Sequence, residues 1–134
     1  MDPKAARTAA AKAFKARGVP LRKGHWRLAH NELTWFVDLR SDGPGRDAAL
    51  RFEVGAWLPA LTTEPEGGAI DCSLLADVPL DGSLDSPGDV AARVDAVVDR
   101  LQAISDPAAL ADAVRSDAFP GAHVDRVLRE HLGL

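Results

Sequence analysis

Two segments in the first half of the chain show a hydrophobic period of two. Residues 33–40 carry apolar side chains at every odd position, and residues 50–57 carry them at every even position. Successive side chains of a strand point to opposite faces of a sheet, so this period predicts two half-buried strands. A third strand is expected around Trp26 and Leu28, and residues 25–58 are therefore predicted to form a three-stranded antiparallel meander.

The first hairpin of this meander can be aligned by its apolar positions. Matching them pairs Leu28 with Trp35, and this alignment sets His25 opposite Asp38. The connection to the third strand is expected over residues 41–47, where glycine, proline and aspartate favour turns over a continued ladder.

Charge predicts the register of the second hairpin. Pairing Leu39 with Leu50 sets Asp38 opposite Arg51, so that opposite charges face each other. A register shifted by two residues would oppose like charges at two positions, Arg40 with Arg51 and Asp38 with Glu53. Like charges directly opposite each other destabilise a strand pair, and we therefore predict the first register.

Capping signals and a period near 3.6 predict four helices. An acidic or hydroxyl residue followed by proline is a good helix start, and it occurs at Asp2, Ser86 and Asp106. Helices are expected over residues 3–17, from 87 to about 104, over 107–118 and over 124–132. The second has the clearest apolar stripe, which is formed mainly by valines.

A fourth strand is expected over residues 69–78. Its alternation places Ile70, Cys72, Leu74 and Ala76 on one face, so Cys72 is predicted to point into the core and to be unreactive. The fold class predicted for residues 1–134 is a single α+β domain. It has an antiparallel sheet of about four strands, with an N-terminal helix and two to three C-terminal helices packed on it.

Composition describes an ordinary soluble globule. The chain has 134 residues, of which 46% are hydrophobic and 27% charged, and its apolar runs are too short for a transmembrane segment. The single cysteine excludes an internal disulfide and fits a reducing compartment. We therefore expect a cytoplasmic protein that does not enter a membrane.

Charge is distributed unevenly along the chain. Residues 1–23 contain seven Lys or Arg and one acid, which gives +6, so the remaining residues carry −10 to reach the net −4. Cations on one helix and its tail usually form a solvated surface. No specific binding of nucleic acid is expected, because the surrounding negative charge would repel phosphate.

Motifs for catalysis, metals and cofactors are not found. The glycines near residue 43 lack the spacing of a phosphate-binding loop, and no nucleophile stands in an activating context. His25 and His30 fall on opposite strand faces, while His123 and His131 lack acidic or thiol partners in register. The sequence therefore predicts no cofactor, no metal site and no catalytic residue.

The charged second face of the meander is the one group of residues with interesting chemistry. Its candidate binding residues are His25, Arg27, Phe36, Asp38, Arg51, Glu53 and Trp57. Charges paired across strands can simply solvate an exposed face, but large aromatic residues bordered by charge are typical of interaction surfaces. Alternatively, His25 beside Asp38 could act as an oriented base, with Arg27 and Arg51 holding an anionic ligand.

Several short motifs resemble the bacterial domain of unknown function 4304 family. They are Phe14, Gly18, Trp26-x-Leu28, the strand ending Val37–Ser41, the strand Phe52–Gly55, and Cys72. The likeness covers about residues 10–78. It implies an α+β domain of uncharacterised role, in a family similar to small immunity or accessory proteins encoded near bacterial toxins, and it implies no catalytic residues.

These observations predict a protein that is not an enzyme and that binds another protein. The alternative is a small enzyme or small-molecule-binding domain that uses the charged sheet face. A deep pocket lined by those residues would favour the alternative, and a flat or convex face would favour the protein partner.

Overall fold

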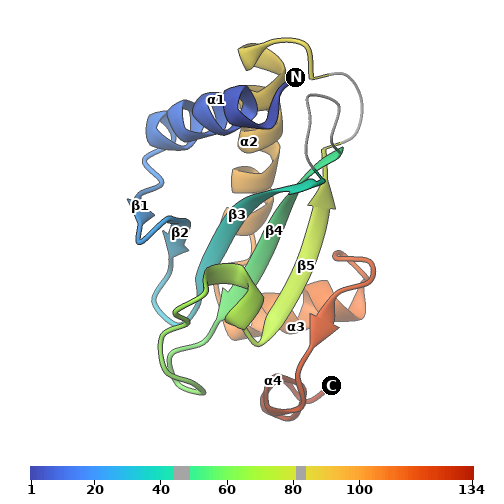
Figure 1. Ribbon diagram of the computed structural model, residues 1–134. Coiled ribbons are helices and arrows are strands. Elements are labelled where there is room, and N and C mark those ends of the chain that lie inside the picture. Colours follow the sequence, from blue (N-terminus) through green and yellow to red (C-terminus); the bar gives the residue numbers. More distant parts are fainter. Residues whose placement is uncertain (44–48, 81–83) are drawn as a thin grey trace.

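Six antiparallel strands form one sheet in which neighbours in space are also neighbours in sequence (Figure 1). The structure is a computed structural model that describes residues 1–43, 49–80 and 84–134. The strands are β1 (Leu21–Arg22), β2 (His25–Ala29), β3 (Thr34–Asp42), β4 (Ala49–Trp57), β5 (Leu74–Pro79) and β6 (His123–Val124). The α+β class and the antiparallel sheet are thus confirmed, but the predicted number of about four strands is wrong. Both additional strands contain only two residues, which is too short to produce a period.

In the described ranges, four α-helices and one 3₁₀ helix accompany the sheet. They are α1 (Pro3–Ala16), η1 (Gly68–Asp71), α2 (Pro87–Gln102), α3 (Pro107–Arg115) and α4 (Arg126–Leu132). Figure 1 shows α2 and α3 behind the sheet and η1 in front of it. The predicted capping residues are confirmed: the Asp2, Ser86 and Asp106 side chains each accept a hydrogen bond from a backbone N–H of the first turn.

The main core lies between one face of the sheet and the helices. The Phe14 ring of α1 stacks on Trp26 of β2 with 4.4 Å between ring centroids. The Trp35 side chain is fully buried, and its indole N–H donates to the Ile104 carbonyl at 2.8 Å. This hydrogen bond ties the segment that follows α2 to the middle of the sheet.

The predicted register of β3 and β4 is wrong by two residues. Asp38 pairs with Glu53 and Arg40 with Arg51, whereas Asp38 had been predicted opposite Arg51. Arg40 removes the expected repulsion, because its guanidinium lies 3.5 Å from Glu53, diagonally across on β4, and 3.9 Å from Asp38, two residues away on the same strand. Arg51 in turn forms ion pairs with Asp42 and Asp77. The β2–β3 register is as predicted, with Leu28 opposite Trp35.

The start of the predicted fourth strand is also wrong. Residues 68–71 form η1, and β5 begins only at Leu74. Gly68 has a φ of +76°, a left-handed conformation that glycine adopts readily and that interrupts an extended chain. Cys72 is buried as predicted, but it packs with Phe36 and Ala69 on the second face of the sheet, not in the main core.

Two boundaries in the C-terminal part differ from the prediction. The third helix ends at Arg115 instead of Ala118, and Asp117 has a positive φ of 58°. Val124 belongs to β6 and lies before the last helix, which begins after the capping residue Asp125. Part of the loop predicted over 41–47 lies outside the described residues, and Ser41 and Asp42 extend β3.

Candidate functional site

The second face of the sheet is largely interior. Residues 59–73, which include η1, lie over it (Figure 1). Four of the seven residues predicted to form the binding face are buried: Arg27, Phe36, Asp38 and Glu53. The other three, His25, Arg51 and Trp57, are half-buried at its borders. This face therefore does not present one continuous charged surface to a partner.

The His25 and Asp38 side chains hold residues 59–73, which we call the covering segment, against the sheet. His25 Nδ1 lies 2.5 Å from Asp38 Oδ1, and the second carboxylate oxygen accepts a hydrogen bond from the Ala69 backbone N–H at 3.2 Å. A Cβ at Gly68 would collide with the His25 ring, so the backbone lies directly against the pair. Both carboxylate oxygens of Asp38 are thus engaged, and the pair has a clear structural role.

Asp38 also belongs to a row of acidic side chains. Asp38, Glu53 and Asp77 lie opposite one another on β3, β4 and β5. Arg40 and Arg51 neutralise the row, although one carboxylate oxygen of Glu53 is buried without a hydrogen-bond partner. Across the described residues, no group of three or more His, Cys, Asp or Glu side chains could hold a metal ion.

The thiol of Cys72 is unreactive near neutral pH. Burial, with a contribution from the nearby Asp38 and Asp71 carboxylates, raises the pKa of the Cys72 thiol to about 12. A thiol is nucleophilic only as the thiolate, so this side chain is inert near neutral pH.

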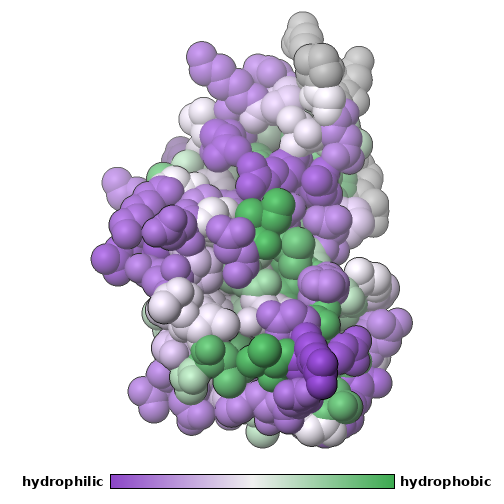
Figure 2. Space-filling view, turned by 60° about the horizontal axis from the view of Figure 1, so that its bottom comes forward, coloured by the Kyte–Doolittle hydropathy of each residue, from purple (hydrophilic) through white to green (hydrophobic). Residues whose placement is uncertain are grey.

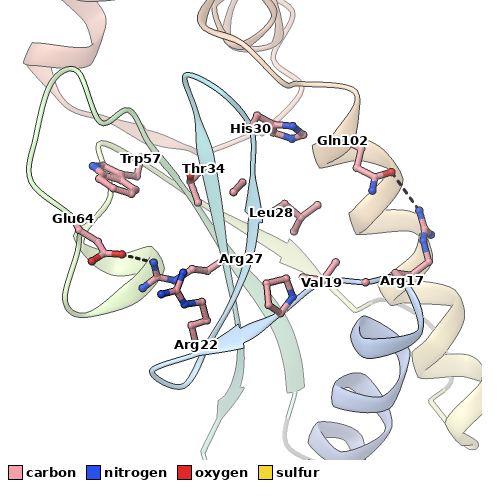
Figure 3. Close-up of a pocket in the computed structure, with 13 residues that line it drawn as sticks. Arg17, Val19, Arg22, Arg27, Leu28, His30, Thr34, Trp57, Glu64 and Gln102 are labelled. Atoms are coloured by element: carbon pink, nitrogen blue, oxygen red, sulfur yellow. Dashed lines mark hydrogen bonds and ion pairs between the residues drawn. The ribbon is translucent and has the colours of Figure 1, made fainter.

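A pocket of about 490 Å³ lies at the edge of the second face (Figure 3). The end of α1, strands β1 and β2 and the segment after β4 form its walls. Polar side chains in its lining are Arg17, Arg22, Arg27, His30, Thr34, Glu64 and Gln102. Val19, Leu28 and Trp57 supply apolar surface. Of the residues predicted for the binding face, the pocket gathers only Arg27 and Trp57.

Arg27 is the most deeply placed cation of the pocket. Its side chain is 8% exposed, and its guanidinium lies 4.6 Å from the centroid of the Phe36 ring. It forms an ion pair with Glu64, and its Nε is buried without a hydrogen-bond partner. Nε2 of His30, another lining residue, is likewise buried and unpartnered. Two residues of the pocket lining thus each carry a buried nitrogen without a hydrogen-bond partner.

The other two arginines line the pocket in different ways. Arg17 forms ion pairs with Asp95 at 3.1 Å and Asp99 at 2.6 Å, both on α2. Arg22 extends into the pocket from β1 (Figure 3). The hydrogen bond and charge of Arg27, together with the positive charge of Arg22 and Lys23, hold the pKa of Glu64 below its usual value.

Sequence reasoning missed this pocket because its residues come from four separate segments. The available signal was the basic N-terminal stretch, in which Arg17 and Arg22 had been interpreted as part of a solvated surface. Only the fold brings Arg22 near Glu64, which pairs with Arg27 from 37 residues away along the chain, and places Arg17 on the far wall of the same pocket.

The outer surface also carries apolar residues. Figure 2 shows an interrupted band of apolar side chains among hydrophilic ones. Within the described ranges, the exposed large apolar residues are Leu21, Ile70, Val127 and Leu134. Leu21 directly precedes Arg22 in β1, so exposed apolar surface adjoins a pocket residue in the chain. No described helix is long and apolar enough to cross a membrane.

Comparisons with protein-family models, with curated proteins and with solved structures found no match for this chain.

Proposed function

We propose that this protein is a non-catalytic binding module that recognises another protein, and that the arginine pocket receives an acidic segment of that partner. The observation that carries the proposal is an open pocket in which Arg22 and Arg27 adjoin Glu64, the one carboxylate of its lining, while Arg17 lines the far wall and is paired with Asp95 and Asp99 of α2. Guanidinium groups bind carboxylates through paired, charge-assisted hydrogen bonds, which gives both affinity and geometry.

The burial of Arg27 favours an anionic ligand in particular. A guanidinium that is 8% exposed interacts with an incoming carboxylate in a medium of lower dielectric than water. Arginine and tryptophan are also the residue types that dominate binding energy at protein interfaces, and Trp57 lines the same pocket. An acidic side chain flanked by an apolar one matches this combination.

The exposed neighbour of the pocket supports a protein partner. Leu21 is 55% exposed and precedes Arg22 in β1 with its side chain on the opposite face of the strand, so only a ligand large enough to pass around this edge strand would contact both residues. A ligand confined to the pocket would leave this side chain uncovered. The Asp38–His25 pair and the inert Cys72 thiol already have structural roles, which agrees with a binding function instead of catalysis.

A second candidate function is the binding of a small acidic molecule in the same pocket. Its volume of about 490 Å³ favours this candidate, because small-molecule sites commonly occupy about 300–1,000 Å³. The ligand chemistry, a carboxylate or another oxyanion, is the same in both cases.

The compartment and the biological role are part of the proposal. A single cysteine without a disulfide partner fits the reducing cytoplasm of a bacterium. The motif resemblance described above would make the partner a toxin or another product of a neighbouring gene, with this protein acting as an immunity-like accessory.

Binding of defined peptides tests the proposal. Fluorescence anisotropy measures the affinity of the protein for a labelled peptide that contains glutamate (the glutamate peptide) and for the same peptide with glutamine in place of glutamate (the glutamine peptide). The salt concentration is about 150 mM, at which long-range attraction between exposed charges is screened. We expect binding of the glutamate peptide alone. Arg22→Glu should weaken it about tenfold or more, because the substitution reverses a charge inside the pocket.

The matched control is Arg129→Glu on α4, which makes the same charge change at an exposed residue outside the pocket. The proposal is wrong if the wild-type protein does not bind the glutamate peptide, or if both variants weaken binding equally. Tight binding of glutarate or phosphate without peptide binding would favour the small-molecule candidate.

A further inference from the structure

We infer that the Glu64 carboxylate occupies the anion site of the pocket in the free protein and that an acidic ligand binds by displacing it. This inference rests on the proposed function and concerns its regulation. Glu64 supplies the one carboxylate in the pocket lining, and its partner Arg27 is the most buried of the three arginines. The ion pair between them is drawn in Figure 3.

The two partners differ in how firmly they are held. The Arg27 side chain lies over the Phe36 ring and is 8% exposed, whereas the Glu64 side chain is 43% exposed. A buried guanidinium needs a counter-charge wherever the carboxylate comes from. Arg27 is therefore the fixed half of the site, and Glu64 is the half that can leave.

Departure of Glu64 does not require the whole segment to open. On one side, the Trp57 indole N–H donates to the Thr62 carbonyl at 3.1 Å. On the other side, the adjacent Pro65 is buried, and the Gly67 N–H donates to the Asp71 carboxylate at 2.7 Å. The backbone is thus anchored before and after Glu64, and rotation of the Glu64 side chain toward solvent is enough to empty the site.

An incoming carboxylate can replace Glu64 as the partner of the Arg27 guanidinium. Arg27 Nε and His30 Nε2 are buried without hydrogen-bond partners and are not needed for this exchange. Exchange of one carboxylate for another keeps Arg27 neutralised throughout. A neutral ligand would instead leave a buried charge unpaired, which is costly. Glu64 therefore lowers affinity for all acidic ligands but sharpens the discrimination against neutral ones.

The inference predicts that removal of the Glu64 charge strengthens binding. Glu64→Gln keeps the size of the side chain but no longer neutralises Arg27, so the affinity for the labelled glutamate peptide should rise about fivefold, as expected for loss of one competing ion pair. The matched control is Glu66→Gln, which changes the net charge identically at an exposed residue of the same segment that does not line the pocket. We expect little change in affinity for this variant.

A structural readout accompanies the affinities. The indole ¹⁵N–¹H resonance of Trp57 reports on the segment, because its hydrogen bond to Thr62 lies two residues before Glu64. This resonance should shift on binding of the peptide to wild type and should already be shifted toward the bound position in free Glu64→Gln. Circular dichroism establishes that both variants are folded.

The outcomes separate the inference from the proposed function. Tighter binding by Glu64→Gln than by wild type and Glu66→Gln supports both. Equal or weaker binding by Glu64→Gln, with wild type still binding, overturns the displacement inference and leaves the pocket assignment intact. If neither wild type nor Glu64→Gln binds the glutamate peptide, the proposed function fails and the inference fails with it.

Discussion

Substitution of Gly55 by alanine should push η1 away from the sheet and lower the stability of the protein. A Cβ at this position would lie 2.6 Å from the Ala69 carbonyl oxygen, 2.8 Å from Ala69 Cα and 2.8 Å from Cys72 Cβ. Two of these atoms belong to the backbone of η1, and carbon atoms in contact normally lie about 3.5–4.0 Å apart. Rotation of a side chain cannot relieve the overlap, so η1 has to move by roughly 1 Å, as follows from those distances.

The expected cost is about 1–3 kcal/mol of unfolding free energy, the usual range for insertion of a methyl group into a packed interior. Part of the overlap cost is offset because alanine loses less backbone entropy than glycine on folding, by roughly 0.5–1 kcal/mol. Urea denaturation followed by tryptophan fluorescence measures the difference, and the rate of Cys72 modification by a thiol reagent reports the loosened cover. We expect this rate to rise.

Gly88→Ala is the matched control. Gly88 lies in the first turn of α2, and the nearest atom to its Cβ would be the Ser86 hydroxyl oxygen at an ordinary 3.6 Å. Since alanine is the better helix former by up to about 1 kcal/mol, this variant should be as stable as wild type or more stable. A Gly55→Ala protein with unchanged stability and an unchanged Cys72 rate would show that η1 does not pack on β4 as described.

Three further predictions concern the core, the thiol and nucleic acid. Trp35→Ala should lower the free energy of unfolding by about 3–5 kcal/mol. Trp35→Phe should lower it less, because phenylalanine retains an aromatic ring and only leaves the Ile104 carbonyl without its hydrogen bond. A loss below about 1 kcal/mol for Trp35→Ala would contradict a core position. The pKa of the Cys72 thiol is about 12 in the folded protein, against an ordinary 9.0, so the contribution of this thiol to stability is present below pH 9 and is lost as the pH rises toward 12. Urea titrations at several pH values should therefore show a smaller alkaline loss of stability for Cys72→Ala than for wild type. Identical pH profiles of the two proteins would refute this. No mobility shift of DNA or RNA is expected at about 150 mM salt, because Arg17 is paired with acidic residues of α2 and Arg7 donates to the Leu39 carbonyl. A shift at this salt concentration that is lost when Lys12 and Lys15 are neutralised would contradict the expectation that the basic N-terminal stretch does not bind nucleic acid.

Local signals predicted the elements better than their alignment. The helix starts at Asp2, Ser86 and Asp106 follow from hydrogen bonds within one turn, and such signals lie in adjacent residues. The β3–β4 register depends instead on long arginine side chains that reach diagonally. Arg40 contacts Glu53 and Asp38 from a position opposite Arg51, which a rule based on direct cross-strand pairs cannot represent.

The candidate site was predicted only in part for a related reason. Period-two patterning correctly assigned Arg27 and Phe36 to the second face but could not show that residues 59–73 cover it. The cover depends on two glycines, Gly55 and Gly68, whose missing side chains allow close approach of backbone to strand and to His25. Glu64 meets Arg27 only because of this cover, so the pocket is a property of the tertiary structure.

The most direct test of the account is to observe the pocket arginines during ligand binding. In a titration of ¹⁵N-labelled protein with the glutamate peptide at about 150 mM salt, a concentration that screens exposed charges, the side-chain Nε–Hε resonances of Arg22 and Arg27 should shift and saturate together. Those of Arg126 and Arg129 on α4 should stay in place. Resonances of Arg22 and Arg27 that do not respond, or that respond no more than those of α4, would contradict the claim that this pocket binds an acidic segment.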